Sequence, residues 1–290
     1  MECREYKTEE HFDLICNWLD DGYYKNHLDM NYILRTRWEY LHAFTIFPFG
    51  TFNRILLWFD SDKLVAVLIS ERSNQEFYLL CNDVINIDYD ELVSDVVSRI
   101  DLNFLLFVDE KNIKLKKALF NAGFKKTEKR EVERQMMNRS FAQEKKGSSL
   151  YYVERFKKEH INSVAKLLCE SYSDTQSKNI IKKNLTHMFK QTYFTEQTHF
   201  LLFKNEEPNV LVSYCGFWVN KDKNYAMIEP LVTHPLYQKK HLSTMIVYEG
   251  MSILSNEGIS CFNVTSEHEF YEKIGFDIIG TRVGYCLTKI

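Results

Sequence analysis

The alternation of apolar and polar positions predicts the same order of elements in both halves of the chain. Residues 89–100 carry apolar side chains at steps of three and four, which predicts an amphipathic helix. The other elements predicted in the first half are helices at 8–19, 31–44 and 112–122 and strands at 55–59, 64–70, 75–81, 104–108 and 130–137. In the second half the pattern predicts helices at 158–171, 178–191, 242–256 and 267–274 and strands at 199–203, 210–219, 225–233, 261–265 and 277–288.

A Gly-Phe pair marks the repeat. Gly123–Phe124 recurs as Gly275–Phe276 at an offset of 152 residues (275 − 123), about half of the 290-residue chain. Each glycine follows a buried strand and a short helix, where it supplies a helix stop. We therefore interpret the chain as an internal duplication of the α/β (α+β) class. We expect two tandem domains, 1–140 and 150–290, each a mixed, largely antiparallel sheet flanked by helices, with the polar segment 137–149 between them.

Composition and charge exclude several classes of protein. Apolar residues make up 45% of the chain, and the net charge of −3 argues against a nucleic-acid binder, which usually carries a basic face. The seven cysteines form no C-x-x-C pair and have no zinc spacing, so we expect reduced thiols and no metal. There is neither a signal core nor a run of bilayer-spanning length, so we expect a cytoplasmic protein without membrane contact.

The segment 228–259 carries the clearest chemical signal. A predicted strand runs into His234-Pro235, where the proline has no N–H to continue a ladder. A short loop follows, and a helix begins near Leu242. Free N–H groups at the start of a helix form an anion cradle that suits a pyrophosphate.

This segment resembles the acetyl-CoA-binding motif of the GNAT superfamily of N-acetyltransferases. The residues that carry the resemblance are Glu229-Pro230, Thr233-His234-Pro235, Tyr237 and the loop Gln238-Lys239-Lys240-His241-Leu242-Ser243, which corresponds to Gln/Arg-x-x-Gly-x-Gly/Ala. Downstream, Tyr271 to Phe276 matches the Tyr-x-x-x-Gly-Phe pattern of the family. The resemblance implies a tandem GNAT-like fold in which the second half uses acetyl-CoA as co-substrate.

The loop departs from the family pattern at two positions. His241 stands where the family has glycine, and Ser243 where it has glycine or alanine. Glycine lets a backbone approach a phosphate closely, so a histidine could narrow the cradle. Its ring could instead donate an N–H to a phosphate oxygen, or it could be an exposed residue without consequence. These three interpretations stay open at this point.

The resemblance also implies which residues contact the cofactor. The pantetheine arm would pair with the backbone of the strand before the loop, and the pyrophosphate would lie on the loop itself. Two polar residues at the end of the following strand are further candidates. The expected contacts are Leu231, Val232 and Thr233 for the arm, Gln238, Lys239, Lys240, His241, Leu242 and Ser243 for the pyrophosphate, and Asn263 and Ser266 for the third group.

Acyl transfer to an amine requires a base for the amine and an acid for the departing thiolate. Glu229 is the candidate base; strand alternation places it on one face with Leu231 and Thr233 if Pro230 causes no bulge. Tyr271, at the position of the tyrosine that often protonates the thiolate in this family, is the candidate acid. An exposed or ion-paired carboxylate and a core aromatic are the structural alternatives for Glu229 and Tyr271.

The first half lacks these features. Leu119 stands where the second half has Tyr271, and the segment 82–91, NDVINIDYDE, places acids where phosphates would have to bind. We therefore expect a degenerate, non-catalytic first half.

The predicted function is transfer of an acetyl or short acyl group from acyl-CoA to a primary amine of a small molecule or peptide, by a monomer or homodimer. The alternative is a degenerate module that binds CoA or another metabolite without acyl transfer. The nine histidines contain no i, i+4 pair typical of a zinc hydrolase, and no G-x-S-x-G elbow is present.

Overall fold

The computed structural model describes residues 1–46, 55–72, 76–82, 86–100, 104–137, 150–172 and 177–287. Most of the predicted linker, 138–149, lies outside these residues, and so does the middle of the acidic segment 82–91. Within the described residues, the strands form one 12-stranded sheet and a separate two-stranded one.

The observed elements follow the predicted order in both halves. The first half consists of β1 (Glu2–Glu5), α1 (Thr8–Asp21), β2 (Tyr23–Tyr24), β3 (His27–Leu28), α2 (Arg35–Leu41), the π-helical turn η1 (His42–Ile46), β4 (Leu56–Asp60), β5 (Lys63–Arg72), β6 (Glu76–Cys81), α4 (Tyr89–Arg99), β7 (Leu105–Asp109), α5 (Ile113–Asn121) and β8 (Phe124–Met137). The second half consists of β9 (Tyr151–Arg155), η3 (Lys158–His160), α6 (Ile161–Ser171), α7 (Lys178–Met188), η4 (Glu196–Thr198), β10 (His199–Lys204), β11 (Glu207–Asn220), β12 (Tyr225–Thr233), η5 (Pro235–Tyr237), α8 (Leu242–Asn256), β13 (Cys261–Thr265), α9 (Glu269–Lys273) and β14 (Asp277–Leu287). The sequence pattern missed β1 and β9, which are short and largely exposed or half-buried.

The two halves repeat one strand arrangement. The first half runs β1-β4-β5-β6-β7 across the sheet, and the second runs β9-β10-β11-β12-β13 from the opposite end. Neighbouring strands are antiparallel except for β6 with β7 and β12 with β13, the same step in each half of the described chain. These mixed, largely antiparallel sheets flanked by helices confirm the predicted fold class.

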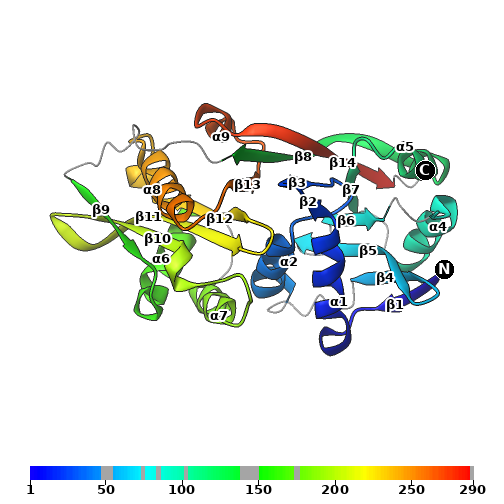
Figure 1. Ribbon diagram of the computed structural model, residues 1–290, viewed down its shortest axis with the longest axis horizontal. Helices are drawn as coiled ribbons and strands as arrows, with labels where there is room; N and C mark the ends of the chain where they lie inside the picture. Colours follow the sequence, from blue (N-terminus) through cyan, green and yellow to red (C-terminus); the bar gives the residue numbers. More distant parts are fainter. Residues whose placement is uncertain are drawn as a thin grey trace.

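The last strand of each half lies in the sheet of the other half. β14 pairs with β7 of the first half, and β8 pairs with β13 of the second half. β8 and β14 also pair with each other, so the two half-sheets are continuous (Figure 1). The predicted strand near 130–137 therefore exists, but it closes the sheet of the second half.

Hydrophobic side chains divide the molecule into one shared core and two separate ones. The shared core lies on the face covered by α1, α2, α6 and α7, and contains residues of both halves, such as Trp38 and Trp218. On the opposite face, α4 and α5 cover a core around Leu92 and Leu119, and α8 and α9 cover a core around Ile246 and Tyr271. The shared core joins the halves into one hydrophobic unit.

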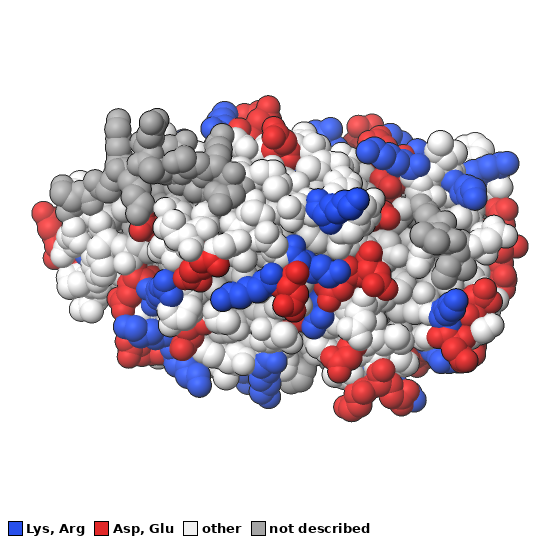
Figure 2. Space-filling model, viewed as in Figure 1, with Lys and Arg blue, Asp and Glu red and all other residues white. Residues whose placement is uncertain are grey.

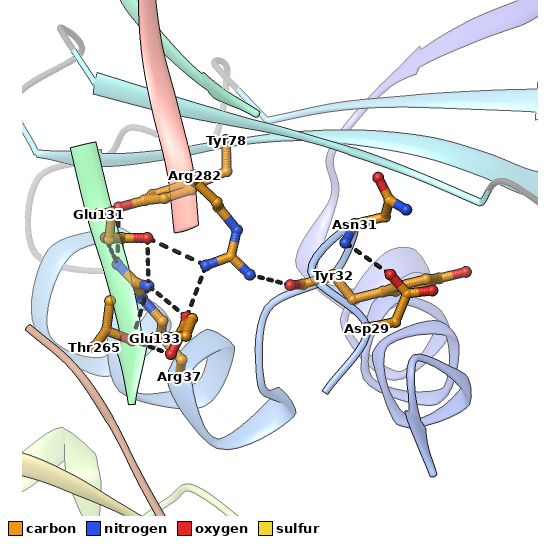
Figure 3. A network of polar contacts seen from close by, with 9 residues as sticks. All are labelled: Asp29, Asn31, Tyr32, Arg37, Tyr78, Glu131, Glu133, Thr265 and Arg282. Carbon is orange, nitrogen blue, oxygen red and sulfur yellow. Dashed lines mark hydrogen bonds and ion pairs between the residues drawn. The ribbon is translucent and has the colours of Figure 1, made fainter. Parts of the chain in front are cut away.

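A buried charge network lies where the exchanged strands meet (Figure 3). Arg37 of α2 pairs with Glu131 of β8 at 2.6 Å, and Arg282 of β14 pairs with Glu133 of β8 at 2.7 Å. Burial alone would raise the pKa of Glu131, but Arg37 and Arg282 outweigh it and lower that pKa. Removal of one partner would leave a buried charge uncompensated, so the network ties β8 to both halves.

Candidate active site

The parallel strands β12 and β13 separate soon after they begin. Their pairing covers only Tyr225–Met227 with Cys261–Asn263. Beyond Met227, the edge of β12 that faces β13 has no strand partner among the described residues, whereas its other edge pairs with β11 as far as Thr233. The predicted arm-binding segment, Leu231 to Thr233, therefore lies on an open strand edge that an extended ligand can pair with.

A bulge interrupts β12 at Glu229–Pro230, where two residues oppose a single residue of β11. The peptide bond between them is cis. Ile228 and Leu231 both pack against the core under α8, although a step of three would place them on opposite faces of a regular strand. The condition for the predicted alternation of Glu229, Leu231 and Thr233, that Pro230 causes no bulge, is therefore not met, and alternation no longer assigns a face to Glu229.

Gly216 of β11 faces this bulge, and no other residue type fits there without movement. A Cβ at Gly216 would lie 2.5 Å from the carbonyl oxygen of Glu229 and 2.6 Å from Nδ1 of His199. The same carbonyl accepts a 2.9 Å hydrogen bond from Nε1 of Trp218. The carbonyl group of Glu229 thus packs closely against Gly216 and is hydrogen-bonded by Trp218.

The loop between β12 and α8 is the segment that the sequence predicts as an anion cradle. Lys239 and His241 both have left-handed backbones, with φ of 61° and 59°, a conformation that favours glycine. Met245 donates the first hydrogen bond of the turn, to the carbonyl of His241 at 3.0 Å. In the described part of the chain, the N–H groups of residues 239–244 have no acceptor, and α8 has no side-chain cap.

Residues of this loop border a hollow of about 300 Å³. Thr233 lies at its rim, and the ring of Phe270 from α9 forms part of its wall; the remaining lining residues are Tyr237, Gln238, Lys239, His241, Leu242, Ser243 and Thr244. Orphaned N–H groups at a helix start, open to a hollow, suit an anionic diphosphate. The residues present therefore fit the pyrophosphate end of acetyl-CoA.

Three side chains of the loop make polar or cation–π contacts with other residues of the protein. Ser243, in the small-residue position of the motif, hydrogen-bonds Thr233 at 2.9 Å, and Thr233 hydrogen-bonds Ser213 at 2.8 Å. Gln238 donates to the carbonyl of Thr233, and the ammonium of Lys240 lies over the ring of Tyr237. The serine hydroxyl is thus directed to β12, and the backbone stays available to a phosphate.

The corresponding helix of the first half, α4, has a side chain that caps its N-terminus. Asp88 caps α4 by accepting a 3.0 Å hydrogen bond from the N–H of Glu91. The carboxylate occupies the position where an anion would bind and would repel a phosphate. Leu119, at the position that corresponds to Tyr271, is fully buried in the core under α4 and α5.

Tyr271 and Glu229 lie close enough to interact electrostatically. Burial of the Tyr271 side chain, which is 8% exposed, and the Glu229 carboxylate both raise the pKa of Tyr271 well above its usual value. The phenol therefore stays protonated at neutral pH, the form that a general acid needs. The ring packs edge-on against Phe276, with 5.6 Å between the centroids.

Asn263 and Ser266 are engaged within the protein. Asn263 is 1% exposed and accepts a 3.0 Å hydrogen bond from Gln135 of β8. The hydroxyl of Ser266 accepts from the N–H of His268, and its own N–H donates to the carbonyl of Val132. Asn263 thus links β13 to β8, and Ser266 links the residues after β13 to β8.

One buried polar pair near the bulge had no signal in the sequence. His199 is fully buried, and its Nδ1 lies 2.8 Å from the hydroxyl of Tyr214. Burial lowers the pKa of His199 to about 3, so its ring is neutral. Neither residue belongs to a motif, and only the pairing of β10 with β11 brings them together.

The surface and the remaining side chains add three findings. On the face drawn in Figure 2, acidic and basic side chains are interspersed. Among the residues that the structure describes, no three His, Cys, Asp or Glu side chains are grouped as a metal site. No helix in the described ranges combines the length and the apolar character needed to cross a bilayer.

Comparisons with known proteins agree with this geometry. Residues 161–276 match the model of the acetyltransferase (GNAT) family. A search of curated proteins gives no match.

Similar solved structures include a tandem GNAT protein from the clavulanic acid biosynthesis pathway (TM-score 0.64, 9% identity, 98% of this chain and 97% of that one). A GNAT-family acetyltransferase from Colwellia psychrerythraea has a TM-score of 0.62 at 10% identity, with 100% of both chains covered. A GCN5-related N-acetyltransferase from Sphaerobacter thermophilus has a TM-score of 0.60 at 8% identity, over 80% of this chain and 79% of that one. The chain has the fold of a tandem GNAT protein, and its residues 161–276 match the acetyltransferase (GNAT) family.

Proposed function

We propose that the protein is an acetyl-CoA-dependent N-acyltransferase whose site lies in the second half and whose acceptor is a primary amine. The observation that carries the proposal is the set of N–H groups without acceptors at residues 239–244, beside the open edge of β12. The contrast between this open helix start and the Asp88-capped start of α4 restricts the site to the second half.

The backbone binds the donor in this proposal. The N–H groups of the loop take the pyrophosphate, and the open edge of β12 pairs with the pantetheine arm as an added strand would. The thioester then lies where β12 and β13 separate, with its carbonyl polarised by backbone N–H groups near Leu231. Bound acetyl-CoA supplies the activated acyl group.

Two side chains move the protons. Glu229, directly or through water, takes a proton from the attacking amine, so that its nitrogen can form the C–N bond to the acyl carbon. The C–S bond breaks, and Tyr271 donates its proton to the leaving thiolate. The raised pKa of Tyr271 keeps this proton in place until the thiolate forms.

Thermal unfolding with acetyl-CoA tests the binding step. Acetyl-CoA at ~100 Kd should stabilise the protein by about 2.7 kcal/mol. Lys240→Glu should weaken this effect through charge repulsion at the loop, whereas Asp90→Asn at the start of α4 should leave it unchanged. Absence of stabilisation at millimolar acetyl-CoA would refute the proposed donor.

The catalytic step needs a separate test. A screen of primary amines with a thiol-detecting readout should find turnover, and Tyr271→Phe should lower kcat by about 100- to 10,000-fold with acetyl-CoA affinity preserved. Binding of acetyl-CoA without turnover on any amine would favour the alternative, a module that binds CoA without acyl transfer. The open cradle supports both functions; the position of Tyr271 within electrostatic reach of Glu229 supports the enzyme.

A further inference from the structure

β8 belongs to the first half in sequence but supports the segment that carries Tyr271. It pairs with β13 along Cys261–Thr265, at the side opposite to β12. The chain leaves β13 at Thr265 and enters α9 at Glu269, so this connection determines where Tyr271 lies. α9 has only five residues, too few to hold its position without tertiary anchors.

β8 contacts this connection from both faces of the sheet. On the face of the shared core, the hydroxyl of Thr265 donates a 2.9 Å hydrogen bond to Glu133. Toward α9, Nε of Arg134 donates a 3.0 Å hydrogen bond to the carbonyl of Ser266. Between these side chains, the N–H of Ser266 donates to the carbonyl of Val132 at 2.9 Å.

Of the β8 residues that make these contacts, Arg134 also reaches α9. Its side chain is 5% exposed, and its buried Nη1, which makes no hydrogen bond among the described residues, lies 3.9 Å from the carboxylate of Glu272, the 70% exposed residue after Tyr271. Arg134 and Met136 share a face of β8, and Met136 packs in the same core as Tyr271. A buried guanidinium with a fixed fork can hold the loop carbonyl and orient the helix together.

We propose that Arg134 is a positioning residue that holds α9 so that the phenol of Tyr271 faces the thioester sulfur. The first half thereby has a role in the reaction, although it has no acyl-CoA site of its own: it supplies the strand that fixes the acid. This inference rests on the proposed function for its kinetic consequence, while its structural part concerns only the contacts of Arg134.

Kinetics in two backgrounds separate positioning from general stability. Arg134→Gln should lower kcat about 10- to 100-fold, because displacement of a catalytic group by about 1 Å costs this much. KM for acetyl-CoA should change less than kcat does, since the loop and the start of α8 supply most of the hollow and α9 supplies only Phe270. In the Tyr271→Phe background the same substitution should have almost no further effect on kcat, because residues that act as one unit are not additive.

Arg130→Gln is the matched control. Arg130 lies on the same strand and pairs with Glu267 of the same connection at 3.2 Å, but both side chains are exposed, and such pairs contribute little. The substitution Arg130→Gln should therefore leave kcat unchanged. Arg134→Lys keeps the charge but can make only one of the two contacts, so it should fold like the wild type and give an intermediate kcat.

Hydrogen exchange gives a readout that needs no acceptor. The amides of residues 269–275 should exchange faster in Arg134→Gln and Arg134→Lys than in the wild type or Arg130→Gln, while those of α8 stay unchanged. Unchanged exchange in α9, or an equal loss of kcat with and without Tyr271, would overturn the inference. If Tyr271→Phe alone leaves kcat unchanged, the proposed acid is wrong, and the exchange result still decides whether Arg134 holds α9.

Discussion

Replacement of His241 by glycine tests how the left-handed residue at the start of α8 affects donor binding. The backbone of His241 has a φ of 59°, which costs a residue with a Cβ roughly 1–2 kcal/mol. Glycine removes that cost but loses about 0.5–1 kcal/mol through the greater freedom of the unfolded chain. The free energy of unfolding of the ligand-free protein should therefore rise by between zero and ~1.5 kcal/mol.

The same substitution should also increase the affinity for acetyl-CoA. Removal of the Cβ and the ring lets the N–H groups of the loop approach a phosphate more closely. We expect Kd to fall about three- to tenfold, equivalent to ~0.7–1.4 kcal/mol. Isothermal titration calorimetry measures Kd directly, and thermal unfolding at several acetyl-CoA concentrations provides an independent value.

His241→Ala separates the backbone from the ring, since it keeps the Cβ in the left-handed conformation and lacks the imidazole. Its Kd should stay within about twofold of the wild type if the ring takes no part in binding. Weaker binding in both variants would refute this reasoning and identify the imidazole as a phosphate donor.

Three further outcomes follow from the geometry. Glu229→Gln should lower kcat, and the loss should shrink as the pH rises and the free amine becomes abundant; a loss that is constant across pH would contradict a role as base. Gly216→Ala should lower the free energy of unfolding by about 1–3 kcal/mol, because its Cβ would lie 2.5 Å from a backbone oxygen; unchanged denaturant midpoints would show that the bulge yields easily. Leu119→Ala, at a fully buried site, should cost about 2–5 kcal/mol in stability while kcat of the folded enzyme is preserved, and a changed kcat would mean that the first half contributes to the chemical step through its core.

Much of the site could be predicted because its signals are local. The loop from Gln238 to Ser243 follows a strand and precedes a helix, and each of these elements has a periodicity that a short stretch of sequence carries. The Gly-Phe stop before β8 and before β14 is equally local, since the positive φ of Gly123 and Gly275 ends a helix irrespective of its surroundings.

Strand alternation could not assign a face to Glu229, for a physical reason. Alternation along a strand holds only while each residue opposes one residue of its neighbour. The opposing strand contributes a single glycine at the bulge, and the chain offers no local sign that Gly216 and Glu229 would meet.

The sequence by itself determined the order of elements within each half, because each element depends on residues that are neighbours along the chain, and the recurrence of that order indicated the duplication. The anion cradle at the start of α8 and the role of Tyr271 as the acid stay predictions; the first rests on a local strand–loop–helix pattern and the second on the family resemblance. Only the tertiary structure decided which sheet each last strand joins, because β8 can satisfy its backbone hydrogen bonds equally well beside β7 or β13. The buried pairing of Glu131 and Glu133 with Arg37 and Arg282 lies at that exchange, and it joins residues that are up to 151 positions apart (282 − 131). Arg134 reaches the connection to Tyr271 through the same exchange, so the support of the candidate acid depends on contacts between the halves.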